Sequence, residues 1–337
     1  MRSPPASLHV RQDGERFESN NPNGDVSNGN VSRETVEKEI VLKRILVPID
    51  GSPAAERVLE VAVALARRCG GELVLGNAVN YAAAIAQCTE PYGVTDAEPL
   101  MQALADEAHG ILSRAEITAK AAGLNVTSVV LEGPASSAIV NYSAEHGIDA
   151  VVMGTRGIDG LERFFLGSTA DGVLRGTELP VFVVQPVADA AAPAFERVLV
   201  AVDDSEASAA AVAFVLDLAT GIGGVALFAH VIVTTELGDT SREYAYDPKP
   251  LFEEARAEAQ TALDAAAAQA QSRGVAAETY VVEGDTVDEL LLAASAHKAD
   301  VIAIGTHGRR GLERLILGSV AEAVVRRSPI PVVVVRR

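Results

Sequence analysis

Tryptophan is absent from the sequence, and aromatic residues make up only 4% of its 337 positions. Any hydrophobic core must therefore be aliphatic, because hydrophobic residues still reach 48%. The only two cysteines, Cys69 and Cys88, cannot form a disulfide framework and suit a reducing compartment. No apolar run has the length of a membrane span, and no apolar signal-peptide segment follows Arg2. These absences predict a cytoplasmic protein.

Basic residues are also scarce, with 28 Lys and Arg against 46 Asp and Glu and a formal net charge of −18. A nucleic-acid-binding protein needs a basic face for the phosphates, and docking on anionic lipid needs one too. We therefore expect neither nucleic acid nor a membrane as a partner. The six histidines do not stand at the spacings of metal ligands, so no metal site is predicted.

The chain is organised as a tail followed by a duplication. Residues 1–38 contain many turn formers and little to bury, which predicts a disordered tail. Behind it, the segment KRILVPIDGS at 43–52 returns as ERVLVAVDDS at 196–205. A repeat of about 150 residues indicates two similar domains. We place them at residues 39–187 and 195–337, with a linker rich in Ala and Pro at 188–194.

Short apolar segments alternate with segments of helical spacing in both copies, which predicts an α/β fold with a parallel sheet covered on both faces. In the first copy we expect strands at 45–49, 72–79, 126–131, 150–153 and 181–184, and helices at 53–68, 99–122, 136–146 and from Ser168. In the second copy we expect strands at 225–231, 277–282, 301–304 and 332–335, and helices at 252–273 and 287–297. Such sheets bind ligands at the carboxyl ends of their strands.

A glycine-rich loop follows the fourth predicted strand of each copy, with the pattern Gly-x2-Gly-x9-Gly-Ser. Its residues are Gly154, Gly157, Gly167 and Ser168 in the first copy, and Gly305, Gly308, Gly318 and Ser319 in the second. Glycine permits a positive φ and lets an anion approach the backbone, and the Gly-Ser pair opens a helix whose free N–H groups attract phosphate. Glycines also serve as plain turns, but recurrence at the same place favours polyphosphate binding. The P-loop and Gly-x-Gly-x-x-Gly patterns are absent.

Together, the opening ILVPID and VLVAVD segments, the glycine-serine loops and the closing PVFVV and PVVVV strands resemble the universal stress protein family, in its ATP-binding subgroup. The resemblance covers nearly the whole chain after the tail, once per copy. It implies two tandem Rossmann-like domains, similar to adenine nucleotide α-hydrolases, each with five parallel strands in the order 3-2-1-4-5. It also implies ATP at the carboxyl ends of the strands. The last strands at 181–184 and 332–335 are apolar and would invite aggregation as open sheet edges. We therefore predict that the two domains pair through these strands within one chain, imitating the homodimer of single-domain relatives, and a homodimer of whole chains stays open.

The resemblance assigns roles to matching positions. Asp50 and Asp203 would contact the adenine or ribose side, and the backbone of Val79 and Val231 would hold adenine. Gly154 and Gly305 would lie near the ribose. The residues that would contact the phosphates are Gly157, Gly167, Ser168, Gly308, Gly318 and Ser319. The ligand is ATP, with AMP or a cyclic adenine nucleotide as alternatives, and Mg²⁺ could accompany it.

Several positions keep a second interpretation. Asp50 and Asp203 could instead cap their loops, and Ser52 and Ser205 fit helix N-caps better than nucleophiles. For His307, inside the second loop, a structural role and a ligand contact are equally open.

The remaining histidines favour structural roles. His146 and His297 stand at equivalent predicted helix ends, which favours capping or packing, and His230 lies in a predicted strand, which favours a core position.

The two copies also differ inside the motifs. Asp204 stands where the first copy has Gly51, and His307 stands where it has Arg156. Charge at the two sites therefore differs, and we expect unequal affinities.

Two functions remain open from the sequence. The favoured one is a stress-response protein that binds adenine nucleotides as a sensor or regulator. The alternative is a slow ATPase or nucleotide-transferring enzyme that uses the same cleft, but no general base or nucleophile can be assigned from spacing. A scaffold with vestigial sites would require a broken loop, and both loops are intact.

Overall fold

A computed structural model describes residues 42–89, 97–155, 166–186, 191–234, 249–306 and 317–336. The predicted tail, residues 1–38, lies outside the described residues, as does part of the predicted linker. The domain limits and the disorder of the tail therefore stay predictions.

The first repeat alternates strands and helices in the expected order. Its elements are β1 (Arg44–Pro48), α1 (Pro53–Cys69), β2 (Glu72–Val79), α2 (Tyr81–Thr89), α3 (Glu98–Ala121), β3 (Val126–Glu132), α4 (Ala135–Glu145), β4 (Ala150–Gly154), α5 (Ser168–Gly176) and β5 (Val181–Val184). The predictions at 72–79 and 181–184 match β2 and β5 at both ends, and the other predicted boundaries differ by a residue or so.

The second repeat follows the same plan. Its elements are β6 (Arg197–Ala201), α6 (Glu206–Ile222), β7 (Val225–Val233), α8 (Lys249–Ser272), β8 (Ala276–Gly284), α9 (Thr286–Ala296), β9 (Val301–Gly305), α10 (Ser319–Arg327) and β10 (Val332–Val335). Within the described part of the chain, no helix combines the length and apolar character needed to cross a membrane.

The strands form one ten-stranded sheet in the order β3-β2-β1-β4-β5-β10-β9-β6-β7-β8. Read from its outer edge, each half has the predicted order 3-2-1-4-5, and every pairing within a half is parallel. The halves join where β5 and β10 pair antiparallel, with Val333 opposite Phe182. The predicted pairing of the last strands within one chain is confirmed.

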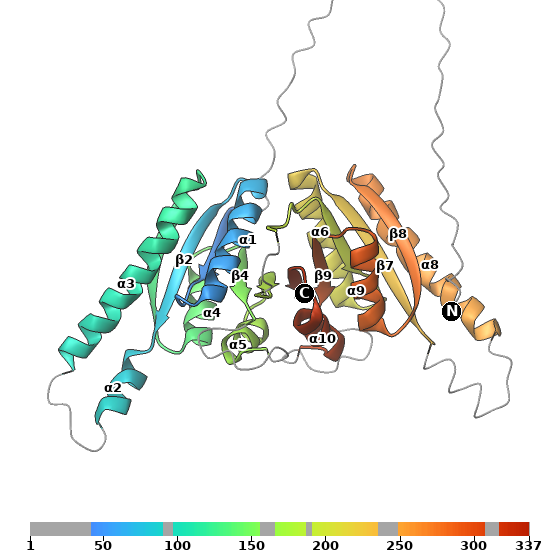
Figure 1. Ribbon diagram of the computed structural model, residues 1–337. Helices are drawn as coiled ribbons and strands as arrows, with labels where there is room; N and C mark the ends of the chain where they lie inside the picture. Colours follow the sequence, from blue (N-terminus) through green and yellow to red (C-terminus); the bar gives the residue numbers. More distant parts are fainter. Residues whose placement is uncertain are drawn as a thin grey trace, which may run out of the picture. The chain divides into compact units, whose positions relative to one another are not determined.

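Two helical layers cover the sheet (Figure 1). Helices α1, α3, α6 and α8 bury their apolar residues on one face, and α4, α5, α9 and α10 bury theirs on the other. The central strands are buried on both faces, which is why they read as continuous apolar runs rather than as alternating ones.

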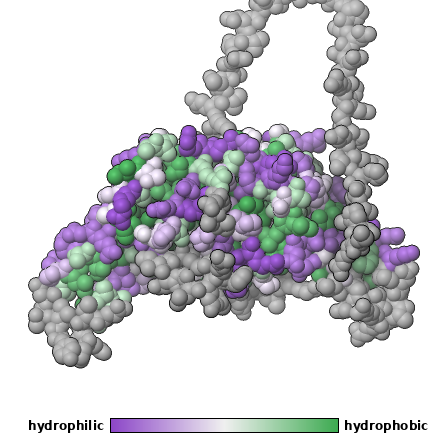
Figure 2. Space-filling view, viewed as in Figure 1, coloured by the Kyte–Doolittle hydropathy of each residue, from purple (hydrophilic) through white to green (hydrophobic). Residues whose placement is uncertain are grey.

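Helix α2 was not predicted. The sequence of Tyr81–Thr89 lacks the charged residues that mark an amphipathic helix, and it precedes a segment that aligns poorly between the repeats. Its alanines at 82, 83 and 86 are exposed, and Figure 2 shows hydrophobic surface where α2 meets the end of α3.

Three of the few aromatic residues gather where the repeats meet. Phe182 of β5 lies edge-on to Phe195 and to Phe214 of α6, with ring centroids 6.1 and 6.2 Å apart. Phe195 is fully buried, although its backbone has a positive φ of 54°. The start of the second repeat is therefore anchored in the core between the repeats.

We expect the two repeats to stay together when the chain is cut within residues 187–190. The β5–β10 pairing and the phenylalanine cluster remain after the cut, and size-exclusion chromatography should return one particle of full size. Val333→Asp, which places a charge at a fully buried position, should make the cut halves separate. Thr127→Asp on the exposed edge strand β3 is the matched control and should not. Separation of the cut wild-type halves into stable monomers would contradict the prediction.

Candidate functional site

The carboxyl ends of β1 and β4 lie side by side in the first repeat. Ile45 pairs with Ala150 and Leu46 with Val151, a register that brings Asp50 alongside the residues that follow β4. In the second repeat, Val198 pairs with Val301 and Val200 with Ala303, so Asp203 has the same place beside β9. The strand order reverses between these two strands, which is where open parallel sheets form their ligand crevice.

Both aspartates shape the turn that leads into the next helix. Oδ1 of Asp50 accepts the backbone N–H of Ser52 at 3.0 Å and its hydroxyl at 2.6 Å. Oδ1 of Asp203 accepts only the backbone N–H of Ser205, at 2.9 Å. The capping interpretation is therefore confirmed, but it engages one carboxylate oxygen. Oδ2 of each aspartate makes no hydrogen bond with a described residue, and both side chains are half-buried.

The serines in these turns differ in what they do. Ser205 is the N-cap of α6, and its hydroxyl accepts the N–H of Ser208 at 3.1 Å, as predicted. Ser52 has the N-cap position of α1, but its side chain makes no cap hydrogen bond, and its hydroxyl instead donates to Asp50. The Asp203 carboxylate consequently carries one hydrogen bond fewer than that of Asp50.

The helices that follow the glycine loops begin without a side-chain cap. Gly167 is the N-cap of α5 and Gly318 that of α10, and no side chain of the described residues caps either helix. By contrast, Asp285 caps α9 by accepting the N–H groups of Val287 and Asp288. The first amides of α5 and α10 are therefore left without an intrahelical acceptor, as helix geometry requires.

The expected positive φ is wrong for these two glycines. Gly167 has a φ of −64° and Gly318 a φ of −62°, values that any residue adopts. Each instead closes the base of its loop, because its N–H donates at 2.7 Å to the carbonyl of Thr155 or Thr306 respectively. Their value to a ligand would be the lack of a side chain rather than an unusual backbone.

Gly305 has a steric reason to be glycine. A Cβ there would lie 2.5 Å from the carbonyl carbon of Ala207 and 2.6 Å from its oxygen. The end of β9 therefore touches the first turn of α6, directly after the loop that holds Asp203. Only glycine permits this approach.

The sheet register corrects one pairing of site residues. The prediction gives Val79 and Val231 the same role, but Ala201 pairs with Ala229 as Pro48 pairs with Gly76. Counting from these pairs, the counterpart of Val231 is Ala78, and that of Val79 is Ile232. Ala78 and Val231 are both half-buried, whereas Val79 and Ile232 are both buried. Val79 and Val231 therefore do not occupy equivalent register positions, and the role of each towards adenine stays a prediction.

Sequence reasoning missed the threonines that follow the first glycine of each loop. Thr155 and Thr306 are buried, and their backbone N–H groups donate to Val184 and Val335 at 3.1 Å. The signal was present, since Gly-Thr occurs in both copies. Gly157, Gly308 and His307 lie outside the described residues, so their roles stay predictions.

Three other histidines have positions that fit the expected structural roles. His146 and His297 are the C-caps of α4 and α9, and they stack on Tyr142 and Tyr280 at 3.9 and 3.6 Å between ring centroids. His230 is buried in β7. Among the described residues, no group of three or more His, Cys, Asp or Glu side chains could hold a metal ion.

We expect Gly305→Ala to lower the melting temperature by several degrees, because the new methyl group would overlap the backbone of Ala207 and overpacking typically costs about 1–3 kcal/mol. Gly110→Ala in α3 is the matched control, since a Cβ there meets only the end of the Arg114 side chain at 3.7 Å. That substitution should be neutral or stabilising. Thermal unfolding of both variants checks the prediction, and an unchanged Gly305→Ala would contradict it.

Comparison with known proteins agrees with the duplicated fold. The model of the universal stress protein family matches residues 42–185 and again residues 194–336. A universal stress protein of Mycolicibacterium smegmatis is 27% identical over 259 residues, covering 76% of this chain and 81% of that protein. The universal stress protein Mb2028c of Mycobacterium bovis is 30% identical over 240 residues, covering 69% of this chain and 78% of that protein.

A solved structure agrees with the arrangement of the strands. The crystal structure of a universal stress protein from Archaeoglobus fulgidus has a TM-score of 0.60 and 22% identity, and it covers 87% of this chain and 96% of that one. This likeness concerns the fold. With the family match over both repeats, the conclusion is that the chain belongs to the universal stress protein family, in a tandem form with two copies of the domain.

Proposed function

We propose that this chain is a cytoplasmic regulatory protein that binds one adenine nucleotide, ATP, in each repeat. The single observation that carries the proposal is the pair of uncapped helix N-termini, α5 and α10, that follow the crevice strands β4 and β9. Amides at such a terminus point towards a ligand, and the helix dipole favours negative charge there.

The phosphates would bind at Gly167 and Ser168 in the first repeat and at Gly318 and Ser319 in the second. The two serines are exposed, so their hydroxyls are accessible as additional donors. A chain with a net charge of −18 needs such local donors to hold a polyphosphate. The loop sequences supply cations as well: residues 307–317 carry three arginines against one glutamate, whereas residues 156–166 carry two arginines against two acidic residues.

The ribose or adenine side would bind at Asp50 and Asp203, each through the carboxylate oxygen that no described residue occupies. Asp203 accepts one hydrogen bond where Asp50 accepts two, and the more cationic loop belongs to the same repeat as Asp203. Both differences favour tighter binding at the second site. The extra carboxylate of Asp204 opposes them, but it is exposed and screened by solvent.

A regulator is favoured over an enzyme because no described side chain beside Asp50 or Asp203 has the arrangement of a nucleophile and its base. Mg²⁺ would arrive with the nucleotide and take its ligands from the phosphate oxygens and water.

Calorimetric titration of the full chain with ATP tests the proposal. We expect two bound nucleotides per chain, with the tighter one in the second repeat. Mass spectrometry of the released ligand should return ATP. Conversion to ADP during incubation would favour the slow ATPase, and the absence of any binding heat and any copurifying nucleotide would refute the proposal.

Ser168→Asp and Ser319→Asp should each remove one of the two bound nucleotides, weakening that site by at least about tenfold. Like charges roughly 4 Å apart near a protein surface repel by several kcal/mol before salt screening. Folding should be preserved, because an aspartate is favourable in the first turn of a helix.

Ser168→Asn and Ser319→Asn are the matched neutral controls and should lose far less affinity. Equal effects of Asp and Asn, or full binding in the Asp variants, would show that phosphate does not bind at these helices.

A further inference from the structure

The residue directly after the last strand of each repeat reaches into the other repeat. Gln185 follows β5, and its Nε2 donates to the carbonyls of Val325 at 2.7 Å and Arg326 at 3.0 Å, both in the last turn of α10. Arg336 follows β10, and its Nη1 donates to the carbonyls of Arg175 at 2.6 Å and Thr177 at 3.3 Å, at the end of α5. The contact is reciprocal because β5 and β10 pair antiparallel.

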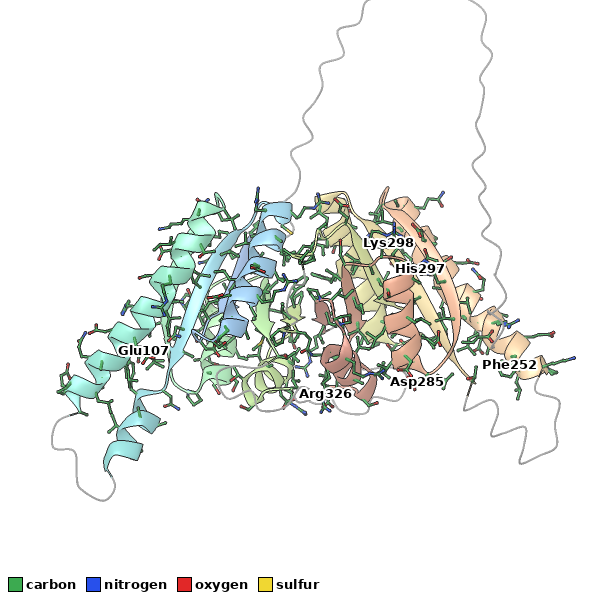
Figure 3. The ribbon with its side chains drawn as sticks, viewed as in Figure 1. Glu107, Phe252, Asp285, His297, Lys298 and Arg326 are labelled. Carbon is green, nitrogen blue, oxygen red and sulfur yellow. The ribbon has the colours of Figure 1, made fainter. Side chains whose placement is uncertain are left out.

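These two helices are the ones whose N-termini form the proposed phosphate sites. Helix α10 begins at Ser319 and has its last carbonyls held by Gln185 of the first repeat. Figure 3 labels Arg326 near the end of this helix. Helix α10 has nine residues with a rise of about 1.5 Å each, so it is short and stiff. A displacement of its C-terminal end is therefore transmitted to its N-terminal end.

Gln185 is also tied to the loop of its own repeat. The hydroxyl of Thr155 donates to Oε1 of Gln185 at 3.1 Å. The carbonyl of the same Thr155 accepts the N–H of Gly167, the N-cap of α5. Hydrogen bonds therefore run without a gap from the base of the first glycine loop, through Thr155 and Gln185, to the end of α10.

Arg336 cannot make the matching connection. An amide has both an acceptor and donors, whereas a guanidinium has donors only. The side chain of Gln185 can accept from Thr155 and donate to α10 at once, whereas the side chain of Arg336 can only donate and so cannot accept from the hydroxyl of Thr306. Gln185 and Arg336 thus both contact a helix of the other repeat, but only the Gln185 side chain can also accept a hydrogen bond from the threonine of its own loop.

The geometry points to Gln185 as a positioning residue that couples the two nucleotide sites: ATP bound at the first repeat holds Thr155 and Gln185, which steady α10 and so change the affinity of the second repeat for ATP. This inference rests on the proposed function and adds a communication between its two sites. Thermodynamic linkage requires the reverse effect to be equally large.

The test measures α10 while only the first site can be filled. In a Ser319→Asp background, ATP is added at a concentration that calorimetry shows to fill the first site and leave the weakened second site empty, and hydrogen–deuterium exchange is followed over residues 320–327 with and without this ATP. We expect ATP to slow exchange there by about fivefold or more, the lower end of typical couplings between sites. The effect should vanish when Gln185→Arg is added.

Gln185→Arg separates coupling from structure. The new side chain can still donate to the α10 carbonyls, as Arg336 does for α5, but it cannot accept from Thr155. The melting temperature should stay within about 2 °C of the parent, while the ATP-dependent protection of α10 is lost. Gln185→Leu removes both links and should lose the protection as well. Gln102→Leu, which breaks one hydrogen bond within α3, is the matched control and should keep it.

The outcomes are distinguishable. If calorimetry shows ATP bound at the first site but exchange in α10 does not change, or changes equally in Gln185→Arg, the coupling through Gln185 is wrong and the proposed function stands. If the parent chain binds no ATP at all, the proposed function is wrong and this inference falls with it.

Discussion

Strands β5 and β10 pair antiparallel, with Val181 opposite Val334 and Val183 opposite Val332, and this pairing organises the molecule. Alone, each strand would be an apolar sheet edge with unpaired backbone groups, the kind of surface that causes aggregation. Paired, they fuse two five-stranded sheets into one and bury three valines and Phe182 of β5 against four valines of β10. The antiparallel sense also sends the residue after each strand towards the other repeat.

The location of the candidate site follows from the burial of the central strands. Their side chains are buried on both faces, so polar side chains that could contact a ligand lie at the ends of the strands. There the chain supplies a half-buried aspartate after β1 or β6, and a glycine loop that leads into α5 or α10. A buried Asn77 supports the first of these turns by donating to the carbonyl of Ile49 at 2.7 Å. In the second repeat, the residue at the register position of Asn77 is His230.

Duplication kept the architecture and let the details diverge. Ser205 caps its helix while Ser52 bonds to Asp50, and Gln185 bridges two elements where Arg336 can only donate. Each change leaves the backbone contacts in place, such as the closure of both loops at 2.7 Å. The two repeats therefore fold alike but differ in the charge near the candidate site and in the side chain that contacts the neighbouring repeat.

The sequence by itself determined the duplication, the strands, the sheet-covering helices and the places of the two glycine loops, because apolar periodicity and repeated motifs are local properties of the chain. It also identified the last strands as partners, since their apolar edges need covering. It could not reveal that Val79 and Val231 differ by one register position, because strand register is set by neighbouring strands. Nor could it show that Gly167 and Gly318 have ordinary φ values, or that Gly305 is required by Ala207. The hydrogen bonds from Thr155 through Gln185 to α10 join residues that are far apart in the chain. The second repeat has Arg336 at the place of Gln185, so no repeated motif marks this contact. Only the tertiary structure could bring them together, because their contact depends on the antiparallel seam rather than on any pattern either repeat carries alone.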